Sequence, residues 1–96
     1  MSEPNATPAP DPFVSRIRER ISDNDREIVE AINRRLELVA ELKGYKEQHG
    51  LPLFDNGREE SLLRYLANVN GGPLSEEGLR ALYKEILDLT KREVFS

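Results

Sequence analysis

The chain has 96 residues, 18 acidic and 14 basic, with a net charge of -4 and no cysteine. One domain of modest size is expected from this length. The absence of cysteine excludes disulfides, thiolate metal sites and a thiol nucleophile, and the acidic balance disfavours a nucleic-acid binder. His49 is the single histidine, so a histidine-based zinc site or a Ser-His-Asp triad has at most one candidate.

Residues 1–12 are rich in proline and contain no apolar run. They lack the basic start and apolar stretch of a signal peptide, so we expect a flexible tail followed by a single domain over residues 13–96. No window approaches eighteen apolar residues, so no membrane span is predicted. Together with the absence of cysteine, this pattern is consistent with a cytoplasmic protein.

The segment from Phe13 to Gln48 contains no proline and one glycine, and its apolar residues recur at helical spacing. They are Ile17, Ile21, Ile28, Ile32, Val39 and Leu42. A single helix of this extent would be about 54 Å long, more than the rest of a 96-residue chain can cover. We therefore expect a second copy of the chain to lie along it.

Two shorter helices are predicted after this one. His49-Gly50-Leu51-Pro52 ends the first helix, and Asp55-Asn56-Gly57 precedes a second from Arg58 to about Asn70. After the break at residues 70–73, Ser75 is a good N-cap for a third helix that extends to about Val94. The pattern predicts an all-α fold of three helices, long, short and medium.

Basic residues fall where the helical period calls for apolar ones. Arg35 lies one turn from both Ile32 and Val39, and Lys46 lies one turn after Leu42. The eleven-residue step between the two bases leaves them about 20° apart around the helix and about 16 Å apart along it. Two long side chains that lean toward each other could hold a ligand of sugar-ring size between them. The competing interpretation is a snorkelling side chain or an interhelical ion pair.

Two further positions have simpler explanations on spacing alone. Arg18 lies about 25 Å from Arg35 along the helix, so it reaches the same pocket only from a second subunit, and an ordinary solvent-facing arginine is the alternative. Glu59 fits the reciprocal position of a capping box with Asn56 as N-cap, or Asp55 caps the helix instead.

The whole set of residues resembles the all-helical (AroQ-type) chorismate mutases. The resemblance rests on Ile17 to Ser22, Asp25, Arg34-Arg35, Lys46 and Asp55 to Glu60, with matching spacing from Arg18 through Glu59, and covers residues 14 to 94. It implies an intertwined homodimer of three-helix subunits that converts chorismate to prephenate, in phenylalanine and tyrosine biosynthesis. This isomerase requires no cofactor and no metal.

The resemblance also implies roles for individual residues. Arg18 of the second subunit would bind the enolpyruvyl carboxylate, Arg35 a carboxylate, and Lys46 the ether oxygen of the breaking bond. Asp55 would lie near the ring hydroxyl of the substrate, and Arg58 would support that region. Glu59 would accept a hydrogen bond from the ring hydroxyl. Thr90 would lie near a substrate carboxylate. At Val94 the family usually has Gln or Glu as a second donor to the ether oxygen, and valine cannot donate.

The departure at Val94 predicts a weak mutase, rescued either by a protonated Glu93 or by a partner synthase of the shikimate pathway. It also keeps alternatives open. An isochorismate-pyruvate lyase has the same fold, although Asp55, Arg58 and Glu59 favour the mutase. A non-catalytic, regulatory helical dimer is a second alternative. A coiled-coil adaptor would explain the long helix but not the pairing of Arg35 with Lys46.

Overall fold

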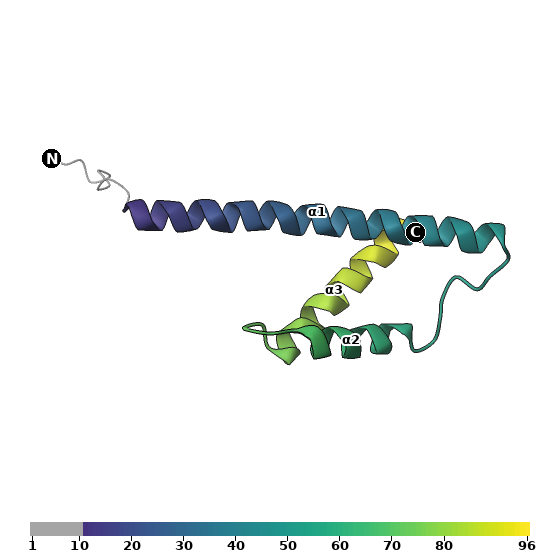
Figure 1. Ribbon diagram of the computed structural model, residues 1–96. Helices are drawn as coiled ribbons and strands as arrows, with labels where there is room; N and C mark the ends of the chain where they lie inside the picture. Colours follow the sequence, from purple (N-terminus) through teal and green to yellow (C-terminus); the bar gives the residue numbers. More distant parts are fainter. Residues whose placement is uncertain (1–10) are drawn as a thin grey trace. The chain divides into compact units, whose positions relative to one another are not determined.

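The computed structural model describes residues 11–96, and within them three α-helices follow one another along the chain (Figure 1). Helix α1 spans Pro12–Gln48, α2 spans Arg58–Val69 and α3 spans Glu76–Val94. The predicted all-α order of a long, a short and a medium helix is confirmed, at 37, 12 and 19 residues. The predicted tail lies outside the described residues except for its last two positions.

Helix α1 begins at Pro12, one residue earlier than the sequence predicted. The carboxylate of Asp11 accepts from the backbone N–H of Phe13 at 2.7 Å and of Val14 at 3.3 Å, which satisfies amides that a helix start leaves unpaired. Proline suits the first helical position because its fixed φ is already helical and its missing N–H is not needed there. Asp11 and Pro12 thus form the start of α1.

The end of α1 forms a glycine-terminated cap. Gly50 has φ 65°, and the backbone N–H of Leu51 donates to the Lys46 carbonyl at 2.8 Å. The Gly50 N–H lies 3.5 Å from the Glu47 carbonyl, which completes the Schellman pattern. This cap fixes the backbone of Lys46 in the last turn of the helix and turns the chain sharply away from it.

Helix α3 begins as the sequence predicted. The Ser75 hydroxyl accepts from the Gly78 N–H at 3.0 Å, so Ser75 is the N-cap. Between α2 and α3, Arg80 donates to both carboxylate oxygens of Glu60, at 3.3 and 3.4 Å. This hydrogen bonding with Glu60 raises the pKa of Arg80. Leu79, 7% exposed, is the buried apolar side chain on the inner side of α3.

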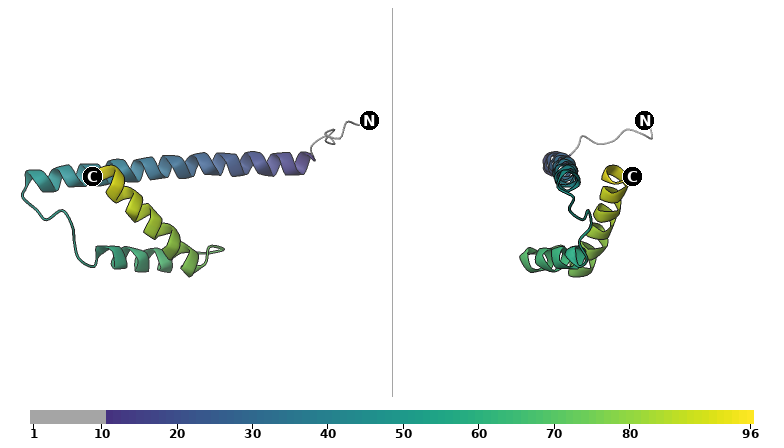
Figure 2. Two further views of the ribbon diagram at one scale, coloured as in Figure 1. Left: turned by 180° about the vertical axis from the view of Figure 1, so that it is seen from behind. Right: turned by 90° about the vertical axis from the view of Figure 1, so that its right-hand side faces the viewer.

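The chain divides into two compact units within α1, between Arg34 and Arg35. In the first unit the structure describes residues 11–34, the start of α1, where Ile21 and Ile28 are about half exposed. The second unit contains the end of α1, α2, α3 and their connections. There α3 leads from α2 back toward the last turns of α1 (Figures 1 and 2). None of the described helices is sufficiently long and apolar to cross a membrane.

Candidate active site

A cavity of about 690 Å³ lies within the second unit, between the end of α1, the connection to α2, the start of α2 and the end of α3. This volume is within the usual range for pockets that bind small molecules. Six residues predicted to contact a substrate line it: Arg35, Lys46, Asp55, Arg58, Glu59 and Thr90. Residues far apart in the sequence are thus brought together around one space.

Arg35 is held in the cavity wall by α3. Its Nη1 donates to the Thr90 hydroxyl at 2.7 Å, and that hydroxyl donates to the Ile86 carbonyl at 2.8 Å. Thr90 is 6% exposed, so this contact is shielded from water. The guanidinium carbon also lies 6.0 Å from the centroid of the Tyr83 ring. Because a guanidinium has five N–H donors, Arg35 keeps donors for an anion while Thr90 and Tyr83 fix its position.

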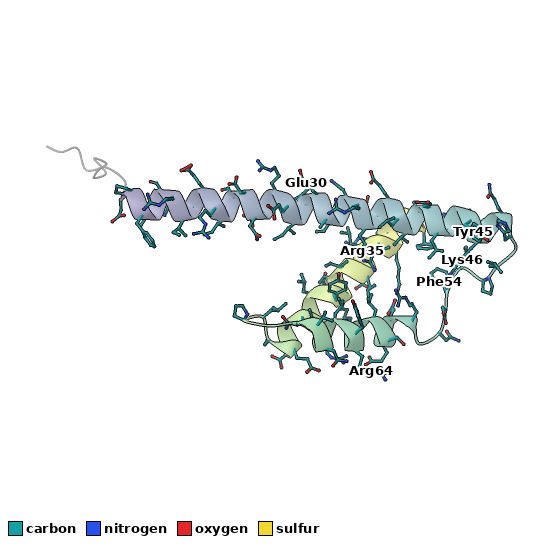
Figure 3. All side chains as sticks on the ribbon, in the orientation of Figure 1. Glu30, Arg35, Tyr45, Lys46, Phe54 and Arg64 are labelled. Atoms are coloured by element: carbon teal, nitrogen blue, oxygen red, sulfur yellow. The ribbon has the colours of Figure 1, made fainter. Side chains whose placement is uncertain are left out.

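Lys46 projects from the last turn of α1 toward the same side as Arg35, with Phe54 nearby in the connection (Figure 3). Within residues 11–96, the ion pairs involve Arg26, Arg64, Arg80 and Lys91, and not Arg35, Lys46 or Arg58. Among the described residues of the chain, therefore, neither Arg35 nor Lys46 forms an interhelical ion pair.

The start of α2 differs from the capping-box hypothesis. The N-cap is Gly57 with φ 86°, a conformation that glycine adopts readily, and no side chain caps the helix. Neither Asn56 nor Asp55 has that role, because the left-handed turn at Gly57 moves the cap one residue along. Glu59 is consequently free of capping, and its carboxylate lies 3.2 Å from the Lys91 ammonium of α3.

Two predicted residues do not line this cavity. Arg18 is exposed and belongs to the first unit. Val94 ends α3, where its carbonyl accepts from the Lys43 ammonium at 3.1 Å, and with the neighbouring Glu93 it lines a separate shallow depression. At this end of α3 the next residue, Phe95, lines the cavity instead.

The lining residues that the sequence analysis did not assign to the site include two cations, Lys43 and Lys91, and two aromatic residues, Phe54 and Phe95. Lys43 lies eight residues after Arg35, which places it about 80° round the helix from it, so the periodicity gave little reason to join them. The adjacency of Lys91 to Thr90 was a usable signal. Phe54 and Phe95 were not predictable, because their roles depend on how a connection meets a helix end.

The charges around the cavity favour an anionic ligand. Its lining contains Arg35, Lys43, Lys46, Arg58 and Lys91 against Asp55, Glu59 and Glu60. Glu59 is paired with Lys91, and Glu60 is paired with Arg80 outside the lining. Arg35, Lys46 and Arg58 have no carboxylate partner among the described residues. Apolar side chains such as Val39 and Leu87 form the rest of the wall and reduce the local dielectric, which strengthens charge interactions. The arrangement suits a small molecule with more than one carboxylate.

Comparison with known proteins agrees with this geometry. The family model for chorismate mutase type II matches residues 17–94. The chain belongs to this family. The sequence-based assignment to the chorismate mutases is thereby confirmed.

Two curated relatives are T-proteins. The chain is 40% identical over 48 residues to the T-protein of Haemophilus influenzae, a match covering 50% of this chain and 13% of that protein. It is 36% identical over 74 residues to the T-protein of Enterobacter agglomerans, covering 72% of this chain and 20% of that protein. The chain thus spans a fifth or less of the length of these relatives.

Two solved structures, both of a chorismate mutase from Thermus thermophilus, are similar over nearly their whole length. Form II matches with a TM-score of 0.73 and 36% identity, covering 85% of this chain and 98% of that one. Form I matches with a TM-score of 0.76 and 35% identity, covering 81% and 98%. These likenesses support the three-helix fold as that of a chorismate mutase.

Proposed function

We propose that the chain catalyses the Claisen rearrangement of chorismate to prephenate, the branch step toward phenylalanine and tyrosine. The observation that carries this proposal is the cavity in which Arg35 and Lys46 lie without carboxylate partners among the described residues. Chorismate is a small dianion, and the family supplies the reaction. Its rearrangement is unimolecular and needs neither a nucleophile nor a proton shuttle, only positioning and charge stabilisation.

Arginine suits the positioning step, because a guanidinium binds a carboxylate through two parallel hydrogen bonds and stays charged. We assign one substrate carboxylate to Arg35, with Thr90 beside it. Holding the dianion in a compact conformer brings the two reacting carbons together and contributes part of the rate. Arg35 is already oriented by Thr90 at 2.7 Å, so little of its freedom is lost on binding.

Lys46 is assigned to the ether oxygen, where negative charge develops as the C–O bond lengthens. A donor already in place at that oxygen stabilises the transition state more than the substrate. Asp55, Arg58 and Glu59 line the side formed by the connection and the start of α2, and we assign them to the ring hydroxyl. Glu59 would accept from that hydroxyl while Lys91 keeps its carboxylate in place.

The second donor to the ether oxygen is absent from this assignment, as the valine at position 94 predicts. Glu93 and Val94 do not line the cavity, which argues against a protonated Glu93 in that role. A missing donor of this kind typically costs about 10²–10³ in rate. We propose that a synthase of the shikimate pathway compensates by binding the mutase. A turnover rate that stays the same when the cognate synthase is added would contradict this partner.

We further propose that the active form is an intertwined homodimer. Helix α1 has no buried side chain among its 37 residues, and its apolar residues Ile21 and Ile28 are 53% and 49% exposed. Water contact at so many apolar side chains is unfavourable, and a second copy would remove it. In that dimer Arg18 of one subunit completes the site of the other. The pathway and the absence of cysteine support a cytoplasmic location.

The direct test is to mix the purified protein with chorismate and follow loss of substrate and gain of prephenate by absorbance. Isochorismate serves as the parallel substrate. The expected result is turnover of chorismate and no turnover of isochorismate. Pyruvate release from isochorismate would favour the lyase. No turnover of either, with or without the synthase, would indicate the non-catalytic dimer. Protection against heat by a dicarboxylate transition-state analogue is the matching binding measurement.

A further inference from the structure

Lys43 lines the cavity, but its ammonium is directed to the end of α3. The Nζ atom donates to the Val94 carbonyl at 3.1 Å and lies 5.5 Å from the centroid of the Phe95 ring. The last carbonyls of a helix have no partner within it and carry the negative end of the helix dipole. A lysine ammonium at this position is therefore favourable, and it joins α1 to α3.

Phe95 also contacts Phe54, which lies in the connection between α1 and α2. Its ring lies 5.0 Å from the ring of Phe54, centroid to centroid, with the two planes inclined by 42°. Phe54 is 64% exposed even with this ring contact, so few other groups surround its ring. Aromatic pairs at this separation attract each other beyond simple burial of area. Lys43, Phe54 and Phe95, here called the Lys43 cluster, thus link three segments of the second unit.

The connection has no long-range hydrogen bond among the described residues. Those formed by residues 51–57 are local, from Leu51 to Lys46, from Arg58 to Asp55 and from Ser61 to Gly57. The ring contact of Phe54 is therefore a tether from this connection to the end of α3. The residue after Phe54 is Asp55, and the connection ends at Gly57, where α2 begins with Arg58 and Glu59.

We propose that Lys43 is a positioning residue of this site: through Phe95 and Phe54 it holds the connection that carries Asp55 and leads into Arg58 and Glu59. The proposal rests on the proposed mutase function for its kinetic part. Lys43 acts on the wall of the cavity and not on the reacting atoms, because its ammonium is engaged by the Val94 carbonyl and the Phe95 ring. Phe95 transmits the effect by contacting both partners.

The kinetic experiment uses Lys43→Met, which keeps the length of the side chain and removes its charge and donors. Because Asp55, Arg58 and Glu59 would be less well placed, KM should rise and kcat/KM should fall about tenfold, equivalent to roughly 1.4 kcal/mol. Lys43→Arg retains the cation and should restore most of the loss. Lys84→Met, an exposed lysine of α3 that does not line the cavity, is the matched control.

A double-mutant cycle separates action through Phe95 from direct action on the substrate. If Lys43 acts through the ring, Lys43→Met and Phe95→Leu together should cost about as much as the more severe single change. Fully additive losses in kcat/KM would overturn the proposal, because they would mean that Lys43 contacts the substrate independently.

Amide hydrogen exchange gives a readout that needs no substrate. Amides of residues 51–57 should exchange severalfold faster in Lys43→Met and Phe95→Leu than in the unsubstituted protein, and at the original rate in Lys43→Arg and Lys84→Met. Unchanged exchange in Lys43→Met would overturn the proposal, whatever happens to activity. Faster exchange in a protein that turns over no chorismate, with or without the synthase, would instead support the tether and refute the proposed function.

Discussion

The two parts of α1 differ in how they use the same helical pattern. In residues 12–34 the apolar residues are largely exposed, and Ile17 and Ile32 are the ones that are partly covered. From Arg35 onward the same stripe carries Arg35 and Lys46 as well as Val39 and Leu42, and all four residues line the cavity. Thr90 of α3 contacts Arg35 there. One stripe on one helix thus provides an uncovered apolar surface at one end and a cavity wall at the other. A single helix can serve assembly and chemistry if polar residues replace apolar ones over only part of its length.

The largest effect is expected from Lys46→Ala in the cavity part. Loss of the ammonium should lower kcat by about 10²–10³, with a much smaller change in substrate binding, because the ether oxygen gains its charge only in the transition state. Steady-state kinetics with chorismate measures both constants. If kcat stays within a few-fold of the unsubstituted protein, the assignment of Lys46 is wrong.

Arg18 connects the two parts of α1 functionally. It lies in the first part, residues 12–34, and is proposed to act in the cavity of a second subunit. Arg18→Ala should lower kcat/KM by about 10², the order expected for a charge-assisted hydrogen bond. Refolding this variant together with Arg35→Ala should restore roughly a quarter of the sites, since half of the dimers are mixed and each has one intact site. No recovery on mixing would show that Arg18 acts within its own chain or not at all.

Assembly itself is tested at Ile28 in the uncovered stripe. Ile28→Gln should raise the dissociation constant of the dimer at least about tenfold, because each subunit would bury an amide in place of an apolar side chain. Glu30→Gln, about 200° round the helix, introduces the same residue and should leave the dimer intact. Analytical ultracentrifugation over a range of concentrations measures both. If the Ile28→Gln and Glu30→Gln variants have equal dissociation constants, the first part of α1 does not lie in the dimer interface.

A smaller effect is expected from a substitution at Thr90, which tests whether α3 orients Arg35 through the Thr90 hydroxyl. Thr90→Val keeps the shape and removes the hydroxyl, so Arg35 loses its partner at 2.7 Å. KM should rise about fivefold, and the free energy of unfolding should fall by about 1 kcal/mol. Steady-state kinetics and denaturant titration measure the two quantities. An unaltered KM would establish that another group orients Arg35.

The smallest effect on catalysis is expected at Ser75, which is remote from both parts. Ser75→Ala removes the N-cap of α3 and should lower the free energy of unfolding by about 1 kcal/mol. Denaturant titration measures this value. Because Ser75 does not line the cavity, kcat and KM should not change. Altered kinetics would mean that fraying at the start of α3 reaches the site.

Much of the fold was predictable because it depends on local chemistry. The three helices, the serine cap at the start of α3 and the glycine end of α1 are determined within a few residues, by periodicity and by the orphan groups of helix ends. That Arg35 and Lys46 share one face of α1 was predictable for the same reason, because both lie on one helix with known geometry. The cap of α2 was not predictable from the sequence. The left-handed turn at Gly57 makes that glycine the N-cap, although the spacing of Asn56 and Glu59 fits a capping box.

By itself the sequence determined the number and order of helices, the apolar stripe of α1, and a set of charged residues typical of one family. The tertiary structure alone decided which of those residues share a space: Thr90 with Arg35, Lys91 with Glu59, and Phe95 with Phe54. The physical reason is distance along the chain. Contacts between residues so far apart in sequence depend on how helices cross and where connections turn, and no local pattern encodes either.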